Sequence, residues 1–335
     1  MRTLWLRKMA LLRHGCRGGA GCYMLALLLL LPVWAQPTIN MPGQVQDTLF
    51  VIDVSESMNV PDTDFPMPHS PRLELAKTLT RESMAALTCG SRVALALFAG
   101  EQIVVLFEPL EVCRHFAAID QVVARLTTHM RWIGDSRVEA GLVQAMEEAK
   151  ARKLAVVMMT DGDEMPHRSA PRITGLERLR GQVRGVVVAI GGDVPHPVPR
   201  VDGHGDVVGY WTPEEAVKEG FHPNLLAVVD ALAPGQQAAD GVLDEVGEHL
   251  SAARPAYLAT LSSAAGLMFI PAKNPSDVLA SLKRSELVVE ASAERDARWL
   301  LGVSASVMVL LGWFWGPLTA SVARIRDRFR LPVRP

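Results

Sequence analysis

The residues of this sequence with the clearest chemical potential are one carboxylate and two hydroxyls at alternate positions, Asp53, Ser55 and Ser57. They follow the apolar run 48–52, which has the composition of a buried parallel strand. Ligand sites of open α/β sheets lie at the carboxyl ends of such strands. Oxygen donors of this kind suit Mg²⁺, Mn²⁺ or Ca²⁺, whereas soft metals prefer sulfur ligands. The pattern therefore predicts a site for a hard divalent cation.

Two later segments supply further oxygen donors in the same order along the chain. Ser136 opens a segment with helical apolar periodicity, and Asp161-Gly162 ends the apolar run 154–160. A plainer interpretation makes Ser136 a helix N-cap and Asp161 a turn residue. Both roles are compatible with binding a cation.

This layout resembles the von Willebrand factor A domain and its metal-ion-dependent adhesion site. The resemblance implies five metal ligands: Asp53, Ser55, Ser57, Ser136 and Asp161. Ser136 stands where the family usually has Thr, a change that keeps the hydroxyl and loses a methyl group. Three neighbouring acids are expected to support the ion or accept hydrogen bonds from a partner: Asp135, Asp163 and Glu164. The alternative for the last two is an acidic loop rim.

Such a site favours binding over catalysis. Two carboxylates balance the ion, while neutral hydroxyls leave it electron-poor and open to an outside oxygen, for which a partner's Asp or Glu is suited. Hydrolysis needs a positioned base or nucleophile as well, and the sequence offers no convincing one. A haloacid dehalogenase-type phosphatase is a weaker alternative, because Ser55 replaces the second Asp of that motif. We expect a protein that is not an enzyme.

Length and composition fit one domain with appendages. The chain has 335 residues, 49% apolar and 21% charged, and a net charge of -2 with no basic patch that would indicate nucleic-acid binding. We expect an α/β fold, a doubly wound and mostly parallel sheet with one antiparallel edge strand, over residues 46–290. Strands are predicted at 48–52, 92–98, 102–107, 154–160, 183–190 and 266–271, and helices at 72–87, 112–126 and 275–282.

Both ends of the chain carry membrane signals. Residues 1–35 have basic residues, an apolar core and a small residue before Gln36, as a secretory signal peptide does, with an uncleaved anchor as the alternative. Residues 299–323 are free of charge and long enough for a transmembrane helix, and five arginines follow in the tail 324–335. The positive-inside rule then predicts a single-pass inner-membrane protein with a periplasmic domain and a cytoplasmic tail.

The cysteines agree with an oxidising compartment. Removal of a signal peptide would leave Cys89 and Cys113 as the only pair. If the strands between them form the antiparallel hairpin that the von Willebrand family has at its sheet edge, both cysteines fall at the rim opposite the metal. A disulfide is then expected, and two buried free thiols are the alternative.

Within the von Willebrand family, four short sequence segments resemble those of MxaL-type proteins of the methanol-oxidation cluster. They are LTCGSRV at 87–93, FEPLEVC at 107–113, MRWIGDSR at 130–137 and TDGDEMP at 160–166. The resemblance implies a role in maturation of, and calcium insertion into, a periplasmic methanol dehydrogenase that contains pyrroloquinoline quinone, alongside a MoxR-type ATPase. The alternative is a scaffold in a membrane complex of the Bat or MoxR-associated type. Residues 193–242, rich in Pro and Gly at their start, are the expected partner-recognition insertion.

Overall fold

The computed structural model describes residues 20–133, 136–164, 173–203, 205–212, 215, 249–272, 280 and 289–328. Side chains are described for these residues except 40–44, 289–295 and 315–328. The chain divides into two compact units, one formed by Gly43–Ala291 and the other by Met1–Pro42 with Ser292–Pro335. Except for residue 280, the predicted helix 275–282 lies outside the described residues, as do residues 216–242 of the predicted insertion.

The larger unit is built on a six-stranded sheet with the order β11-β6-β5-β2-β3-β4. Its strands are β2 (Thr48–Asp53), β3 (Arg92–Ala99), β4 (Gln102–Glu111), β5 (Ala155–Thr160), β6 (Gly185–Ala189) and β11 (Met268–Pro271). Strand β4 is antiparallel to β3, and the other neighbouring strands pair in parallel. The predicted α/β fold, mostly parallel with one antiparallel edge strand, is confirmed.

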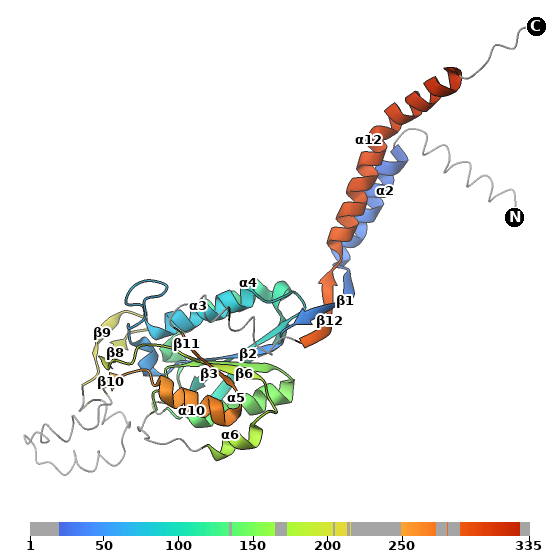
Figure 1. The fold of residues 1–335 in the computed structure, drawn as a ribbon. Coiled ribbons are helices and arrows are strands. Elements are labelled where there is room, and N and C mark those ends of the chain that lie inside the picture. The colour runs from blue at the N-terminus through green and yellow to red at the C-terminus, as the bar shows by residue number, and fades with distance from the viewer. Residues whose placement is uncertain are drawn as a thin grey trace, which may run out of the picture. The chain divides into compact units, whose positions relative to one another are not determined.

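Helices cover both faces of this sheet (Figure 1). On one face lie α3 (Arg72–Ala85) and α4 (Val112–Ala124), and on the other lie α5 (Val138–Arg152), α6 (Thr174–Leu179) and α10 (Pro255–Ala265). Strand β2 is buried at all six positions because both faces are covered. Its alternate residues enter two separate cores, with Phe50 in the first and Leu49 in the second.

One glycine sets how closely α5 lies against the sheet. A Cβ atom on Gly141 would come within 2.2 Å of the Phe98 ring, so only a glycine fits where this helix crosses β3. The first turn of α5 follows Ser136. The close approach therefore helps to fix the loop that carries Ser136 beside the end of β3.

The start of the predicted insertion is ordered as short strands. These are β7 (His196–Pro197), β8 (Pro199–Val201) and β9 (Val207–Tyr210), with β8 and β9 paired and β7 paired to β10 (Leu250–Ser251). Asp202 and Asp206 close the turn between β8 and β9, since the Asp202 carboxylate accepts a hydrogen bond from the Asp206 N–H at 3.0 Å. The Pro- and Gly-rich start of the predicted insertion therefore consists of short strands and a turn.

The smaller unit contains two helices and a pair of strands. Helix α2 (Ala20–Leu30) continues into the 3-10 helix η2 (Leu31–Ala35) and then β1 (Thr38–Val45), which pairs with β12 (Val289–Asp296). Helix α12 (Arg298–Arg328) follows β12 and covers the predicted membrane segment. Over the part of the chain that the structure describes, in which the side chains of α12 end at residue 314, no helix is both long enough and apolar enough to cross a membrane.

Candidate metal centre

Asp53 ends β2 with both carboxylate oxygens engaged. Its Oδ1 accepts a hydrogen bond from the Ser55 N–H at 2.9 Å, and its Oδ2 accepts one from the Thr160 hydroxyl at 2.6 Å. The side chain is fully buried. Thr160 ends the neighbouring strand β5, so this contact ties the first candidate loop to the second at the same edge of the sheet.

Ser55 is the N-cap of the 3-10 helix η3 (Glu56–Asn59), and Ser57 lies within this helix. Both side chains are buried, and their Oγ atoms are 3.0 Å apart. The intervening Glu56 forms an ion pair with Arg131. The two hydroxyls predicted as ligands are thus adjacent to each other and to the Asp53 carboxylate.

Asp161 follows β5 and is also fully buried. Its Oδ1 accepts a hydrogen bond from the Asp163 N–H at 2.9 Å, and its Oδ2 accepts one from Arg72 Nη1 at 2.8 Å. The charge of Asp161 also acts on Asp53. The two carboxylates predicted as ligands therefore lie at one site, each already held by protein donors.

Ser136 reaches the same edge of the sheet from the loop before α5. It forms an isolated parallel bridge with Gly100, and the next residue, Arg137, donates its N–H to the Gly100 carbonyl at 2.7 Å. Gly100 directly follows β3, the neighbour of β2. The Ser136 Oγ is buried and has no hydrogen-bond partner among the described residues, so it is a donor oxygen without an assigned contact.

The acidic residues after Asp161 are buried rather than exposed at a rim. Asp163 and Glu164 are 2% and 1% exposed. Glu164 Oε1 accepts a hydrogen bond from the Glu139 N–H in the first turn of α5 at 3.1 Å, which joins this loop to the helix that follows Ser136. The third acid predicted to support the ion, Asp135, lies outside the described residues.

This crowding of buried acids changes their protonation. Burial, followed by the charge of Asp161, raises the pKa of Asp53 to about 7, although hydrogen bonds from Thr160 and Ser55 oppose the shift. Burial and the same Asp161 charge raise the pKa of Asp163 to about 7. Both shifts mean that the hydrogen-bond donors and cationic groups described around these acids do not fully balance their negative charge. A bound cation would supply the missing positive charge.

Sequence reasoning missed Arg72, the first residue of α3. Its fully buried guanidinium contacts Asp161, donates to both oxygens of Asp62 at 3.0 and 3.1 Å through Nε, and donates to Ser251 Oγ at 2.7 Å. The basic residue stands in an amphipathic helix pattern that gives no sign of burial. The burial of Arg72 can be understood only from the fold, which brings Asp62 and Asp161 to the same guanidinium.

The donor set fits a hard cation. Two oxygens on neighbouring octahedral positions about 2.1 Å from Mg²⁺ lie about 3.0 Å apart, and the Ser55 and Ser57 Oγ atoms have that spacing. Within the described residues, the one group of three Cys, His, Asp or Glu side chains at ligand distance is Cys89, Glu111 and Cys113. Its cysteines form a disulfide, so that group is not a competing site for a soft metal.

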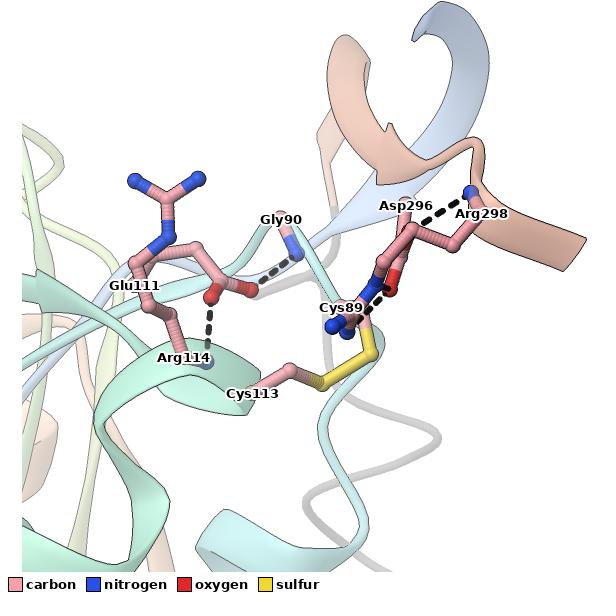
Figure 2. The surroundings of a disulfide bond; sticks show 7 residues. All are labelled: Cys89, Gly90, Glu111, Cys113, Arg114, Asp296 and Arg298. Carbon is pink, nitrogen blue, oxygen red and sulfur yellow. Dashed lines mark hydrogen bonds and ion pairs between the residues drawn. A yellow bond between two sulfur atoms is a disulfide. The ribbon is translucent and has the colours of Figure 1, made fainter. Parts of the chain in front are cut away.

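That disulfide lies where β3 starts, whereas the candidate metal site lies where β2 and β5 end. Figure 2 shows its surroundings. Cys89 precedes β3 and Cys113 lies in the first turn of α4, with their Cα atoms 5.3 Å apart. Glu111 braces the same corner, since its carboxylate accepts hydrogen bonds from the Gly90 and Arg114 N–H groups at 2.7 and 2.6 Å. The predicted bridge is confirmed.

The chain is similar to several known proteins. Residues 48–164 match the family model of the von Willebrand factor type A domain. Among curated proteins, none matches the chain. Solved structures similar to it include an aerotolerance-related membrane protein from Bacteroides fragilis, with 13% identity, a TM-score of 0.47, and coverage of 72% of this chain and 98% of that one.

Two other solved structures are also similar to the chain. A conserved hypothetical protein, BatB, from Bacteroides thetaiotaomicron has 12% identity, a TM-score of 0.47, and coverage of 71% of this chain and 96% of its own. Proximal thread matrix protein 1 from the mussel byssus, with zinc in its MIDAS motif, has 16% identity, a TM-score of 0.33, and coverage of 46% and 40%. Residues 48–164 are therefore similar to the von Willebrand factor type A domain, and they contain strands β2, β3, β4 and β5 of the central sheet.

Proposed function

We propose that this protein is a binding module, not an enzyme, which captures partner proteins through a divalent cation. The supporting observation is the pair of buried hydroxyls, Ser55 and Ser57, with their oxygens 3.0 Å apart beside the Asp53 carboxylate. The unpartnered Ser136 Oγ is the third hydroxyl available to the ion. When bound, the cation supplies an electron-poor centre that accepts a carboxylate oxygen from a partner.

In this proposal the carboxylates of Asp53 and Asp161 have a different role from the serine hydroxyls. The oxygens of Asp53 and Asp161 are engaged by N–H, hydroxyl or guanidinium donors. They supply negative charge to the ion and orient the loops, and water is the natural bridge between each of them and the cation. This occupancy also argues against a hydrolytic role, because neither carboxylate is poised to take a proton from an attacking water.

We further propose that the domain works outside the cytoplasmic membrane, held by α12, with the arginine-rich tail on the cytoplasmic side. The charge-free segment 299–323 and the arginines after it support this orientation. The Cys89–Cys113 disulfide supports an oxidising compartment such as the periplasm.

For the client, the MxaL-type strings favour an immature methanol dehydrogenase containing pyrroloquinoline quinone, or an accessory protein of its maturation with a MoxR-type ATPase. The proposal predicts that the client offers an exposed Asp or Glu at the contact. If the captured client is unrelated to a dehydrogenase, the protein is instead a scaffold that binds its partners through the same cation site.

Titration with Mn²⁺, followed by electron paramagnetic resonance, tests the cation site in the full chain. Ser55→Ala and Ser57→Ala should each lower the affinity at least about ten-fold, the effect seen for groups that merely support a ligand. Ser83→Ala is the matched control, because the Ser83 hydroxyl is also buried and unpartnered but lies on the core face of α3. Equal Mn²⁺ affinity in all three variants would overturn the proposal.

A further inference from the structure

The N-terminal helix α2 packs against α12, and both belong to the same compact unit (Figure 1). The strand that follows η2 pairs with the strand that precedes α12, and the Ala297 N–H donates to the Pro37 carbonyl at 2.9 Å. The chain leaves α2 and enters α12 at this same place, so the two helices run antiparallel. Residues that resemble a removable signal in the sequence are a packed element of the fold.

The packed faces show a seven-residue pattern on each helix. The less exposed side chains include Cys22, Ala26, Leu29 and Val33 on the N-terminal segment, and Leu301, Ala305, Met308 and Gly312 on α12. Both sets follow the spacing of four, three and four residues expected where two helices pack side by side. Ala26 and Ala305 are each only 4% exposed, and small residues at such positions let helices approach closely.

The outward faces of both helices are strongly apolar. Leu27, Leu28 and Leu31 are 66%, 56% and 67% exposed, and on α12 Val303, Leu310 and Phe314 are 56%, 57% and 53% exposed. A helix pair that is apolar all round has no water-facing side. Its surroundings must therefore be as apolar as the side chains themselves.

Charge identifies the surroundings as a lipid bilayer. Arg13 and Arg17 precede α2, and Arg324, Arg326 and Arg328 lie at the end of α12. In chain order, each basic flank lies on the side of its helix away from the β1–β12 pair. That distribution suits the anionic cytoplasmic leaflet.

We propose that the first 35 residues are retained, and that α2 and α12 form a two-helix membrane anchor with both termini in the cytoplasm. The acyl chains of the bilayer cover the outward faces. This anchor does not depend on the cation site, so either proposal can fail without the other. In place of one tether, the domain then has two connections to the membrane, joined at their base by β1 and β12.

Intact mass tests retention directly. The full chain with a C-terminal tag is produced in a bacterial host that exports it, and is purified from membranes in detergent. We expect a mass that includes residues 1–35. A mass that begins after Ala35 would overturn the proposal.

A crosslink tests the packing of the two helices. Cys22 and Gly312 both belong to the less exposed positions where α2 packs against α12. We expect Gly312→Cys to form a disulfide with Cys22 when membranes are oxidised, since a bridge needs two cysteines on facing sides of the helix pair. Leu310→Cys, on the exposed face, is the control and should give only a trace of this crosslink.

The products are assigned by peptide mapping with mass spectrometry. Equal crosslinking of Cys22 in the Gly312→Cys and Leu310→Cys variants would overturn the proposed packing. A second copy of the chain is the other occupant to exclude for the outward faces. An intermolecular disulfide between Leu310→Cys chains, forming in lipid nanodiscs in most of the protein, would contradict the assignment of these faces to lipid.

Discussion

The guanidinium of Arg72 contacts three separate segments: Asp62 after η3, Asp161 after β5, and Ser251 in β10. Asp62 in turn accepts a hydrogen bond from the Gly192 N–H at 3.0 Å. Gly191 permits this approach, because its φ is +100° and a Cβ there would lie 2.4 Å from Arg72 Nε. One buried cation of the protein itself thus holds together the loops around the candidate metal site.

Replacing Arg72 with Leu should be strongly destabilising. Two buried carboxylates would lose their partner, and breaking such a pair costs on the order of 3–5 kcal/mol. Thermal and guanidinium unfolding of the full chain in detergent measures the change in the free energy of unfolding.

Arg81→Leu is the control, since its ion pair with Asp120 is partly exposed and such pairs contribute about 1 kcal/mol or less. Equal losses in the two variants would contradict the structural role given to Arg72.

The raised pKa values predict a dependence of stability on pH. Asp53 and Asp163 have folded pKa values of about 7 against an ordinary value of 3.8, so the folded chain holds protons that the unfolded chain releases. Their stabilising contribution is present below the ordinary pKa and is lost as pH rises through about 7. Without cation, the unfolding temperature should therefore fall over this range.

A divalent cation should reverse that trend, because it binds the charged form of the site. The increase in unfolding temperature on adding Mg²⁺ should be larger near pH 7.5 than near pH 5. Asp53→Asn removes one of the two titrating groups and should reduce both effects. A Mg²⁺ effect of the same size at both pH values would be inconsistent with the charge arrangement described.

At this scale, sequence identifies the candidate ligands that are close together in the chain. Asp53, Ser55 and Ser57 can be recognised because these oxygen-bearing residues stand at alternate positions directly after an apolar run. Thr160, whose hydroxyl donates to Asp53, looks like an ordinary strand residue until β5 is placed beside β2. Contacts made only through tertiary structure leave no local pattern.

Among the elements, the central strands were predictable because burial on both faces makes them continuously apolar. Strand β4 extends to Glu111, beyond the predicted end at residue 107. Pro109 suggests a break there, yet an edge strand tolerates proline because one side of its backbone pairs with no neighbour. Its pairing with β3 also contains irregular register, so alternation fails near its end.

Helix α10 was missed, although its ends carry recognisable signals. Pro255 occupies the first turn and Gly266 ends the helix in a left-handed conformation, φ 71°. Between them, Ser and Thr residues weaken the apolar pattern. Thr260 and Ser262 satisfy their hydroxyls on backbone carbonyls four residues earlier, so they cost the helix little.

The disulfide lets stability and cation binding be separated. Cys89→Ala with Cys113→Ala should lower the free energy of unfolding by on the order of 3 kcal/mol, the chain-entropy value for a loop of this length. Cation affinity should stay unchanged, because the bridge lies where β3 starts and the site lies where β2 and β5 end. Chemical unfolding and Mn²⁺ titration measure the two quantities, and a weakened affinity would show that the two sheet edges are coupled.

For the whole molecule, the sequence predicted a folded domain between two apolar segments, and the structure describes helices at both segments. Pairing of α2 with α12 could not be read from sequence, because signal peptides and retained helices share the same composition. The proposed division of labour follows: one unit captures a partner through a cation, and the other keeps the complex at the membrane.

The most direct measurement is capture of partners from solubilised membranes by the tagged full chain, with Ca²⁺ or Mg²⁺ present and after chelation. We predict proteins that are retained with cation, released by chelator, and absent from an Asp53→Asn bait that still shows the Cys89–Cys113 bridge and cooperative unfolding. Identification of those proteins by mass spectrometry then shows whether a methanol dehydrogenase is among them. Retention of the same proteins by both baits, regardless of chelator, would contradict a cation held by Asp53, Ser55, Ser57, Ser136 and Asp161 as the means of capture.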